Sequence, residues 1–337
     1  MTDQRIKRIA DFIAPLRVKS GRKVVLAKDF DPGYRADFLH KRDGVGLLEQ
    51  GVEMLTDYQA RLAAQDTYGV LIVLQALDAA GKDGAIRHVM SGVNPQGVHV
   101  HSFKVPSAEE LDHDYLWRFA QRLPGRGEIG IFNRSYYEEV LVVRVHQEIL
   151  KRQKLPPAGR GGDVFARRYR DINNWERYLV DNGFRIVKLF LNLSKEEQRT
   201  RFLRRIDLPE KNWKFSAGDV QERRHWDEYQ HAFSQMLSHT STEWAPWYVI
   251  PADRKWFARV AVAAVIVDAL VGIDPKYPER AGEARASLLS TTADLAREAP
   301  AGAAADPFEA ERLAEAAKAG SKNGAKKVAK AKAVKSA

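Results

Sequence analysis

The chain carries a lysine in a turn of small residues directly after an apolar stretch. The apolar stretch 69–76 is rich in valine, isoleucine and leucine, and residues 78–84 read Asp-Ala-Ala-Gly-Lys-Asp-Gly. This order is typical of a strand that leads into a phosphate-binding loop, where backbone N–H groups surround the phosphate and the lysine neutralises it. We therefore predict that phosphate is bound by Ala79, Ala80, Gly81, Lys82 and Gly84.

The loop departs twice from the usual pattern G-x-x-x-x-G-K-[ST]. Ala76 replaces the first glycine, and Asp83 replaces the serine or threonine. A carboxylate binds Mg²⁺ more strongly than a hydroxyl does, and it repels phosphate unless a metal ion lies between them. We therefore predict Asp78 and Asp83 as ligands of Mg²⁺ or of its water shell, with Mn²⁺ as a substitute. The alternative is an ordinary strand–turn–helix with a solvent-exposed lysine.

A second polar group follows the apolar segment 128–132. An aspartate commonly ends such a strand, but here the residue is Asn133, so Glu138 is the nearest source of negative charge. Arg134 offers a fork-shaped donor suited to phosphate. We predict nucleotide contacts for Asn133, Arg134 and Glu138, and metal binding for Glu138. The alternative is that Arg134 pairs with a surface acid and Glu138 is a solvated helix residue.

A third group is rich in cations. Arg201, Arg204 and Arg205 are spaced so that they share one face of a helix, and Lys211 and Lys214 follow. In phosphoryl-transfer enzymes, a cationic lid closes over the reacting phosphates and excludes water. We predict such a lid over about residues 199–225 and phosphate contacts for all five cations; a solvated charged face is the alternative.

The hydrophobic pattern predicts the elements that position these groups. Strands expected at 98–103, 128–132, 185–191 and 247–250 join the strand before the loop, and they alternate with helices. This alternation predicts an α/β fold with a parallel five-stranded sheet, helices on both faces, and ligands at the carboxyl ends of the strands. The expected helices span 44–65, 84–91, 107–122, 136–150, 165–182, 219–239 and 255–272, and residues 194–197 are expected to cap a further helix that ends before 209.

Composition sets the domain limits and excludes some classes of protein. We expect an N-terminal extension over 1–43, a kinase-like domain over 44–277 and a disordered Ala/Lys-rich tail over 278–337. The net charge is +10, but residues 318–337 contain seven lysines and no acid, so nucleic-acid binding is expected only through this tail. The most apolar helix candidate, 256–270, is too short to span a membrane. The absence of cysteine fits a cytoplasmic protein.

Taken together, these motifs resemble the polyphosphate kinase 2 family over about residues 15–275. The matching segments are 77–84, 103–107, 133–138, 212–216 and 241–256. The resemblance implies a P-loop kinase fold like that of thymidylate kinases, with a helical lid. It also implies Mg²⁺-dependent phosphoryl transfer between inorganic polyphosphate and nucleotides, and it adds Lys104 to the polyphosphate-binding residues. We also expect a homo-oligomer, either a dimer or a tetramer.

Asn133, Arg134, Ser135 and Glu138 resemble the third class of that family. This resemblance implies phosphorylation of AMP to ADP and of ADP to ATP, in a reversible reaction that extends to guanine nucleotides. One alternative is an ATP-dependent nucleoside or nucleotide kinase of the same fold, which the choice of phosphate donor distinguishes. The other is a nucleic-acid-binding protein, whose binding would disappear when the residues after 280 are removed.

Overall fold

The computed structural model describes residues 3–36, 40–212, 217–304 and 308. The chain divides into two compact units, residues 1–277 and residues 278–337, which we describe separately. Two parts of the predicted lid fall outside the description, namely residues 213–216, which include Lys214, and the side chain of Lys211.

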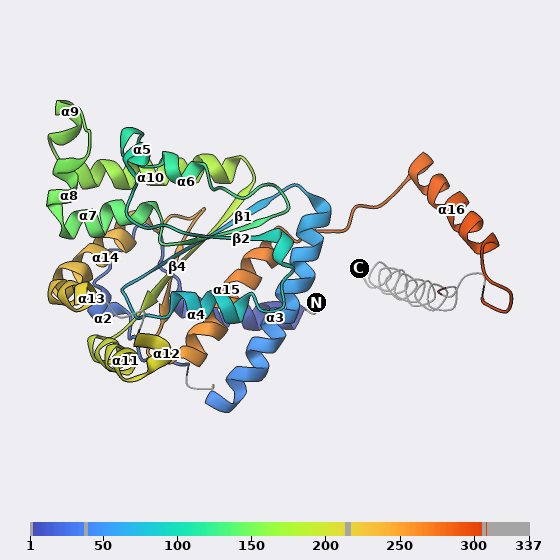
Figure 1. Ribbon diagram of the computed structural model, residues 1–337, viewed down its shortest axis with the longest axis horizontal. Helices are drawn as coiled ribbons and strands as arrows, with labels where there is room; N and C mark the ends of the chain where they lie inside the picture. The colour runs from blue at the N-terminus through green and yellow to red at the C-terminus, as the bar shows by residue number, and fades with distance from the viewer. Residues whose placement is uncertain (1–2, 37–39, 213–216, 305–307, 309–337) are drawn as a thin grey trace, which may run out of the picture. The chain divides into compact units, whose positions relative to one another are not determined.

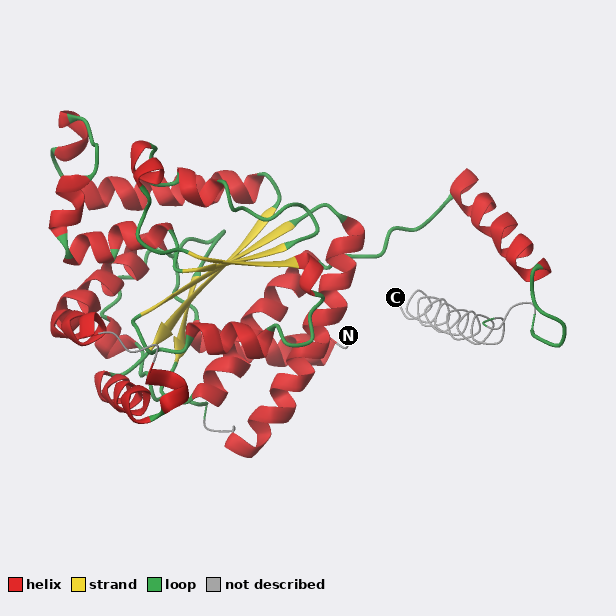
Figure 2. Ribbon diagram, in the orientation of Figure 1, coloured by secondary structure: helices red, strands yellow, loops and turns green. Residues whose placement is uncertain are grey.

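The first unit is built on a five-stranded sheet with the order β2-β3-β1-β4-β5 (Figure 2). All neighbouring strands are parallel, which confirms the predicted α/β class. The central strand β1 is buried along nearly its whole length, as expected for a strand with helices on both faces. The strands are β1 (Gly69–Ala76), β2 (Val98–Ser102), β3 (Ile129–Asn133), β4 (Phe184–Asn192) and β5 (Trp247–Pro251).

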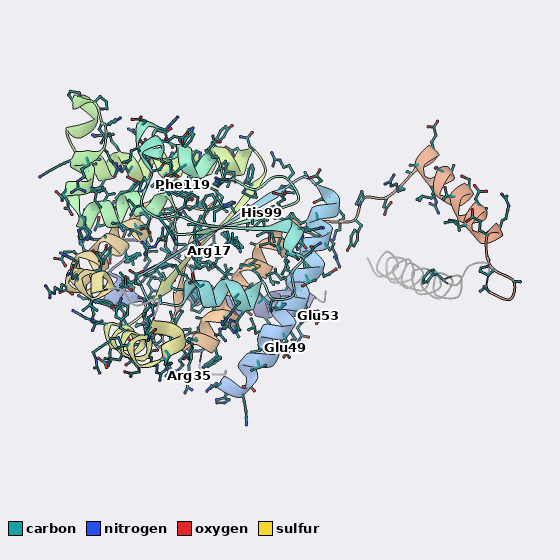
Figure 3. All side chains as sticks on the ribbon, in the orientation of Figure 1. Arg17, Arg35, Glu49, Glu53, His99 and Phe119 are labelled. Carbon is teal, nitrogen blue, oxygen red and sulfur yellow. The ribbon has the colours of Figure 1, made fainter. Side chains whose placement is uncertain are left out.

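Helices cover both faces of the sheet (Figure 1). One apolar core lies under α1 (Asp3–Ile13), α3 (Lys41–Gln65), α4 (Lys82–Val89) and α15 (Lys255–Ile273). On α3, Leu55 and Leu62 face this core while Glu49 and Glu53 are exposed on the outer side (Figure 3). A second core lies under α10 (Val164–Asp181), α14 (Trp226–Thr240) and the 3-10 helix η3 (Tyr136–Val140).

Helix α15 matches the expected helix 255–272 to within one residue, and it extends beyond the apolar segment 256–270 that was expected to be too short to cross a membrane. Its 19 residues are long and apolar enough to cross a membrane by length and composition alone. However, 61% of its most apolar window is buried inside the protein, where it contacts α3 and the sheet. The position of α15 in the core therefore explains why its residues are so apolar.

Three predicted helices are broken in the structure. The segment 107–122 forms α5 (Ala108–Asp112) and α6 (Trp117–Ala120), because the chain is extended at His113. The segment 136–150 forms η3, α7 (Val142–Val145) and α8 (Gln147–Arg152), with non-helical backbone at Leu141 and His146. Its four valines weaken helix formation through their restricted χ1 angle. The segment 219–239 begins with α13 (Ala217–Glu222) and η4 (Arg223–His225) before α14 starts.

Both ends of the chain contain helices that the sequence pattern did not reveal. Residues before 43 form α1, η1 (Ala14–Leu16) and α2 (Leu26–Asp29), and Ile13 and Leu16 belong to the core. In the segment expected to be disordered, α16 (Gly282–Arg297) is helical although none of its residues is buried. Its alanine, leucine, glutamate and arginine residues favour a helix even without a core.

Candidate active site

The carboxyl ends of β1 and β3 open into a cleft beside the predicted lid. Asp78, Arg134 and Glu138 lie on one side of this cleft, and Gln198 and Arg223 come from the lid side. Further lining residues are Gln75, Ala76, Leu77, Leu141, Val142, Asp219, Glu222, Trp226, Tyr229 and Phe233. The cleft therefore combines charged groups at the strand ends with an apolar wall from Leu141, α7 (Val142–Val145) and α14.

The phosphate loop connects β1 to the N-terminus of α4. Gly81 has φ +105°, a conformation that favours glycine, and Ala79 has φ +66°. The Lys82 ammonium donates a hydrogen bond to the Ala76 carbonyl oxygen at 3.0 Å. Burial lowers the pKa of Lys82, and the nearby Asp78 carboxylate opposes this shift. The loop thus places a half-buried cation directly beside the end of β1.

Arg134 joins two carboxylates that line the cleft. Its Nη2 contacts Asp78 Oδ1 at 2.9 Å, and its Nη1 contacts Glu138 Oε2 at 3.3 Å. Burial opposes charge on Arg134, but Glu138 and Asp78 raise its pKa overall. Burial also raises the pKa of Glu138, with Arg134 and Lys82 acting against this rise. Asp78, Lys82, Arg134 and Glu138 therefore form one electrostatic unit. Together with Asp83, these are the residues that the sequence predicts as catalytic.

Arg134 also holds a strained backbone. Its φ is +63°, and its N–H donates to the Leu74 carbonyl oxygen at 3.1 Å. A non-glycine residue in this region costs roughly 1–3 kcal/mol, and such strain is concentrated at functional sites. This backbone conformation turns the chain at the end of β3, where the Arg134 side chain contacts Asp78.

Asn133 lies beside Asp83 at the far side of the loop. Its Nδ2 donates to Asp83 Oδ1 at 2.9 Å and lies 3.4 Å from Ser102 Oγ. Its Oδ1 is buried and has no hydrogen-bond partner among the described residues. An acceptor oxygen beside a carboxylate fits Mg²⁺, which takes one or two protein oxygens and completes its shell with water and phosphate.

The three carboxylates predicted as metal ligands do not form a metal cluster. Over the described part of the chain, no group of three or more His, Asp or Glu side chains is placed to hold an ion. Asp78 and Glu138 are instead bound by Arg134. A metal ion at the phosphate loop itself would depend on Asp83, Asn133 and the phosphates of the substrates.

The surroundings of Arg201 differ from those expected of a residue that binds substrate phosphate. Its side chain is only 4% exposed and pairs with Glu197 at 2.8 Å. Its Nη1 donates to the carbonyl oxygens of Ala79 and Ala80 at 3.0 and 2.7 Å, and its Nη2 donates to that of Ala252 at 2.6 Å. Every guanidinium nitrogen is thus occupied by protein, so Arg201 shapes the phosphate loop and has no donor left for substrate.

The other predicted cations are more exposed. Lys104 follows β2 and is exposed, as is Arg204, whereas Arg205 contacts Asp219 at 3.3 Å. Arg204 and Arg205 lie on α11 (Lys195–Asp207), the first helix of the predicted lid, which continues through α12 (Pro209–Asn212). Arg205 therefore reaches the cleft through Asp219, which lines it, whereas Lys104 and Arg204 are not among the lining residues.

Sequence reasoning missed three residues that contribute to the cleft. Gln75 donates to Ser135 Oγ at 3.0 Å, and Gln198 donates to the Asp78 carbonyl oxygen at 3.1 Å. Tyr229 lines the apolar wall and donates to Glu222 at 2.8 Å. A glutamine within the apolar run 69–76 was the available signal for Gln75; the other two have no comparable signal.

Comparison with known proteins identifies the family of the chain. The family model for Polyphosphate kinase 2 (PPK2) matches residues 39–278. The ADP-polyphosphate phosphotransferase of Rhodopseudomonas palustris is 52% identical over 284 residues, which cover 83% of this chain and 96% of that protein. The AMP/ADP-polyphosphate phosphotransferase of Meiothermus ruber is 46% identical over 256 residues, covering 75% and 91%.

A solved structure shows the same fold. The crystal structure of polyphosphate kinase 2 from Arthrobacter aurescens TC1 superposes with a TM-score of 0.73 at 40% identity, covering 82% of this chain and 95% of that one. The family match spans more than half of the chain and includes the phosphate loop, Arg134, Glu138 and the lid. The chain belongs to the polyphosphate kinase 2 family.

Proposed function

We propose that this protein transfers the terminal phosphoryl group of inorganic polyphosphate to nucleoside mono- and diphosphates, converting AMP to ADP and ADP to ATP. The transfer breaks the terminal P–O–P bond of polyphosphate and forms a new bond from that phosphorus to an oxygen of the acceptor phosphate. The donor leaves one phosphate shorter. No general base is required, because the acceptor oxygen is already anionic.

The observation that carries the proposal is the placement of Arg134 between Asp78 and Glu138, next to Lys82. Both carboxylate contacts are partly exposed, so substrate phosphate can compete for the guanidinium. Lys82 and the loop amides bind one phosphate, and Arg134 binds the group that is transferred. Positioning and charge neutralisation of this kind supply most of the rate enhancement in phosphoryl transfer.

The proposal includes Mg²⁺ as the cofactor, with Mn²⁺ as a substitute. Asp83 and the unpartnered Oδ1 of Asn133 are the residues that would hold it. When bound, a divalent cation neutralises phosphate charge and lets a carboxylate stand close to the substrates. The side chains of Asp83 and Asn133 keep these two oxygens together on the rim of the loop.

We propose that Glu138 allows the site to accept both monophosphates and diphosphates. A monophosphate leaves a gap where a diphosphate places its β-phosphate, and a half-buried carboxylate can hold water or a cation in that gap. The names of the relatives differ in this respect, since one specifies ADP and the other AMP and ADP. Acceptor range is therefore the property of this site that most needs measurement.

A donor test decides the proposal. The purified protein is incubated with Mg²⁺ and AMP, ADP, GMP or GDP, and each acceptor is offered either polyphosphate or ATP as the donor. We expect polyphosphate to support formation of ADP from AMP and of ATP from ADP. Product that forms with ATP but not with polyphosphate would contradict the proposal and assign an ATP-dependent nucleotide kinase.

A further inference from the structure

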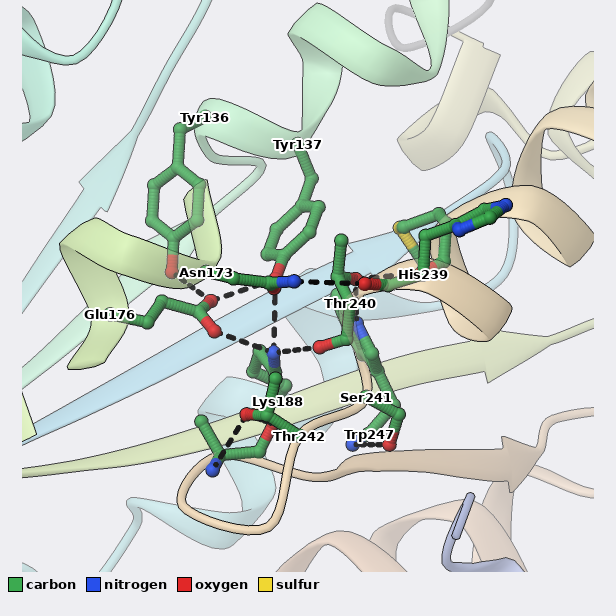
Figure 4. A network of polar contacts seen from close by, with 12 residues as sticks. Tyr136, Tyr137, Asn173, Glu176, Lys188, His239, Thr240, Ser241, Thr242 and Trp247 are labelled. Carbon is green, nitrogen blue, oxygen red and sulfur yellow. Dashed lines mark hydrogen bonds and ion pairs between the residues drawn. The ribbon is translucent and has the colours of Figure 1, made fainter. Parts of the chain in front are cut away.

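Behind the segment that carries Arg134 and Glu138 lies a fully buried charged pair (Figure 4). Glu176 comes from α10 and Lys188 from β4, and both side chains have zero exposure. The Lys188 Nζ contacts Glu176 Oε2 at 2.7 Å. Neither residue lines the cleft, so substrate binding does not explain the presence of two charges in the core.

Two tyrosines of η3 complete this pair. Tyr136 and Tyr137 both donate their hydroxyls to Glu176 Oε1, at 2.8 and 2.7 Å (Figure 4). Burial and the Glu176 carboxylate raise the pKa of both tyrosines, so both hydroxyls remain protonated donors. Lys188 donates to the Tyr137 hydroxyl at 3.0 Å and to the Thr240 carbonyl oxygen at 2.6 Å. The three protons of the lysine are therefore all used.

These contacts hold the turn on which two site residues stand. Ser135, Tyr136 and Tyr137 lie between Arg134 and Glu138 in the chain, and Glu138 directly follows Tyr137. On the opposite side, the Ser135 hydroxyl accepts hydrogen bonds from Gln75 at 3.0 Å and from the Tyr137 N–H at 3.3 Å. The turn is thus anchored to α10 and β4 behind it and to β1 below it.

A buried ion pair is a weak source of stability, because apolar residues of similar volume often serve as well or better. A strained turn, in contrast, persists only where its surroundings determine its conformation. We propose that Glu176 and Lys188 are positioning residues that fix η3 through Tyr136 and Tyr137, and thereby hold Arg134 and Glu138 in their reactive geometry. This inference rests on the proposed function, because it assigns the network to the same reaction.

Tyr137→Phe tests the inference with the smallest structural change, since it removes one hydroxyl and keeps the ring. We expect kcat for polyphosphate-dependent phosphorylation of ADP to fall about tenfold, because small misplacement of catalytic groups is costly. The KM for polyphosphate should remain within about twofold of the parent value, since no binding group is removed. Tyr169→Phe is the matched control, because Tyr169 is buried on α10 and its hydroxyl contacts Arg144 outside the network.

A double-mutant cycle with Glu138→Gln shows whether the effect acts through the site. In the Glu138→Gln background, Tyr137→Phe should reduce kcat by less than about threefold, because coupled residues are not additive. The same fold-loss in both backgrounds, or a loss no larger than that of Tyr169→Phe, would overturn the inference. Failure of the proposed function is distinct, since the parent protein would then form no product from polyphosphate.

Discussion

Two arginines contact the phosphate loop, and their partners are of different kinds. Arg134 is 39% exposed and contacts the carboxylates of Asp78 and Glu138. Arg201 is 4% exposed and donates mainly to backbone carbonyl oxygens of the loop and of the chain after β5. Partly exposed pairs with carboxylates add little stability, so Arg134 can exchange its partners for phosphate. Arg201 is instead a part of the loop's own structure.

The largest effect is expected at Lys82, the lysine of the loop that both arginines contact. Lys82→Ala should lower kcat by roughly a thousandfold or more, because a preorganised charge at the reacting phosphates is lost. The fold should remain intact, as circular dichroism and thermal unfolding would show. Lys28→Ala, at an exposed lysine on α2, is the control and should be near normal. Near-normal turnover by a folded Lys82→Ala protein would show that the loop does not bind the reacting phosphate.

Substitution of Arg134 should affect mainly activity, and substitution of Arg201 should affect mainly stability. Arg134→Ala should reduce kcat/KM on the order of a hundredfold through lost charge stabilisation, with little change in Tm. Arg201→Ala should lower Tm clearly, because each buried carbonyl left unpaired costs about 1–3 kcal/mol. Kinetics and differential scanning calorimetry on both variants measure this contrast. The reverse pattern, in which Arg134 governs Tm and Arg201 only turnover, would overturn the comparison.

Asp83 lies in the part of the loop that we propose to hold the metal ion, and neither arginine is paired with it in the contacts given above. Asp83→Ser should lower kcat/KM at ordinary Mg²⁺ by about ten- to a hundredfold, because the carboxylate that we propose to hold the cation is lost. The change restores the residue type usual in such loops, so it also tests whether the site depends on a carboxylate. Activity equal to that of the parent over a Mg²⁺ titration would exclude a metal-side role.

The C-terminal unit should matter least. Removing residues 281–337 should change kcat by less than about twofold and leave Tm nearly unaltered, because segments without buried apolar surface contribute little to folding. Helix α16, the helix described in this unit, has no buried residue. Turnover and thermal unfolding of the shortened chain provide the measurement. A large fall in Tm would show that these residues stabilise the remainder of the protein.

Much of this organisation was predictable because it depends on local patterns. Apolar strands and the small-residue turn around Lys82 specify the parallel sheet and the loop at its edge. Arg134 and Glu138 were identified because they follow a strand end, where ligands bind in such sheets. Tertiary contacts account for what was missed. Arg201 has the spacing of a lid cation, and only the folded chain places the Ala79 and Ala80 carbonyl oxygens against it.

The buried network illustrates the same limit. Glu176 and Lys188 lie twelve residues apart in sequence, on a helix and a strand, and no local pattern relates them to Tyr136 and Tyr137. The broken helix after Tyr136 was also missed, because its apolar spacing suits a helix although valine disfavours one. Residues whose partners are distant in sequence could therefore not be assigned before the fold was known.

The central claim is that Arg134 and Glu138 form a site that accepts both monophosphates and diphosphates. The most direct test compares kcat/KM for AMP and for ADP, with polyphosphate as donor, in the parent protein and in Glu138→Asn. We predict that the variant loses on the order of tenfold more activity with AMP than with ADP, because only the monophosphate depends on the carboxylate to hold water or cation in the gap. An equal loss with both acceptors would contradict the account.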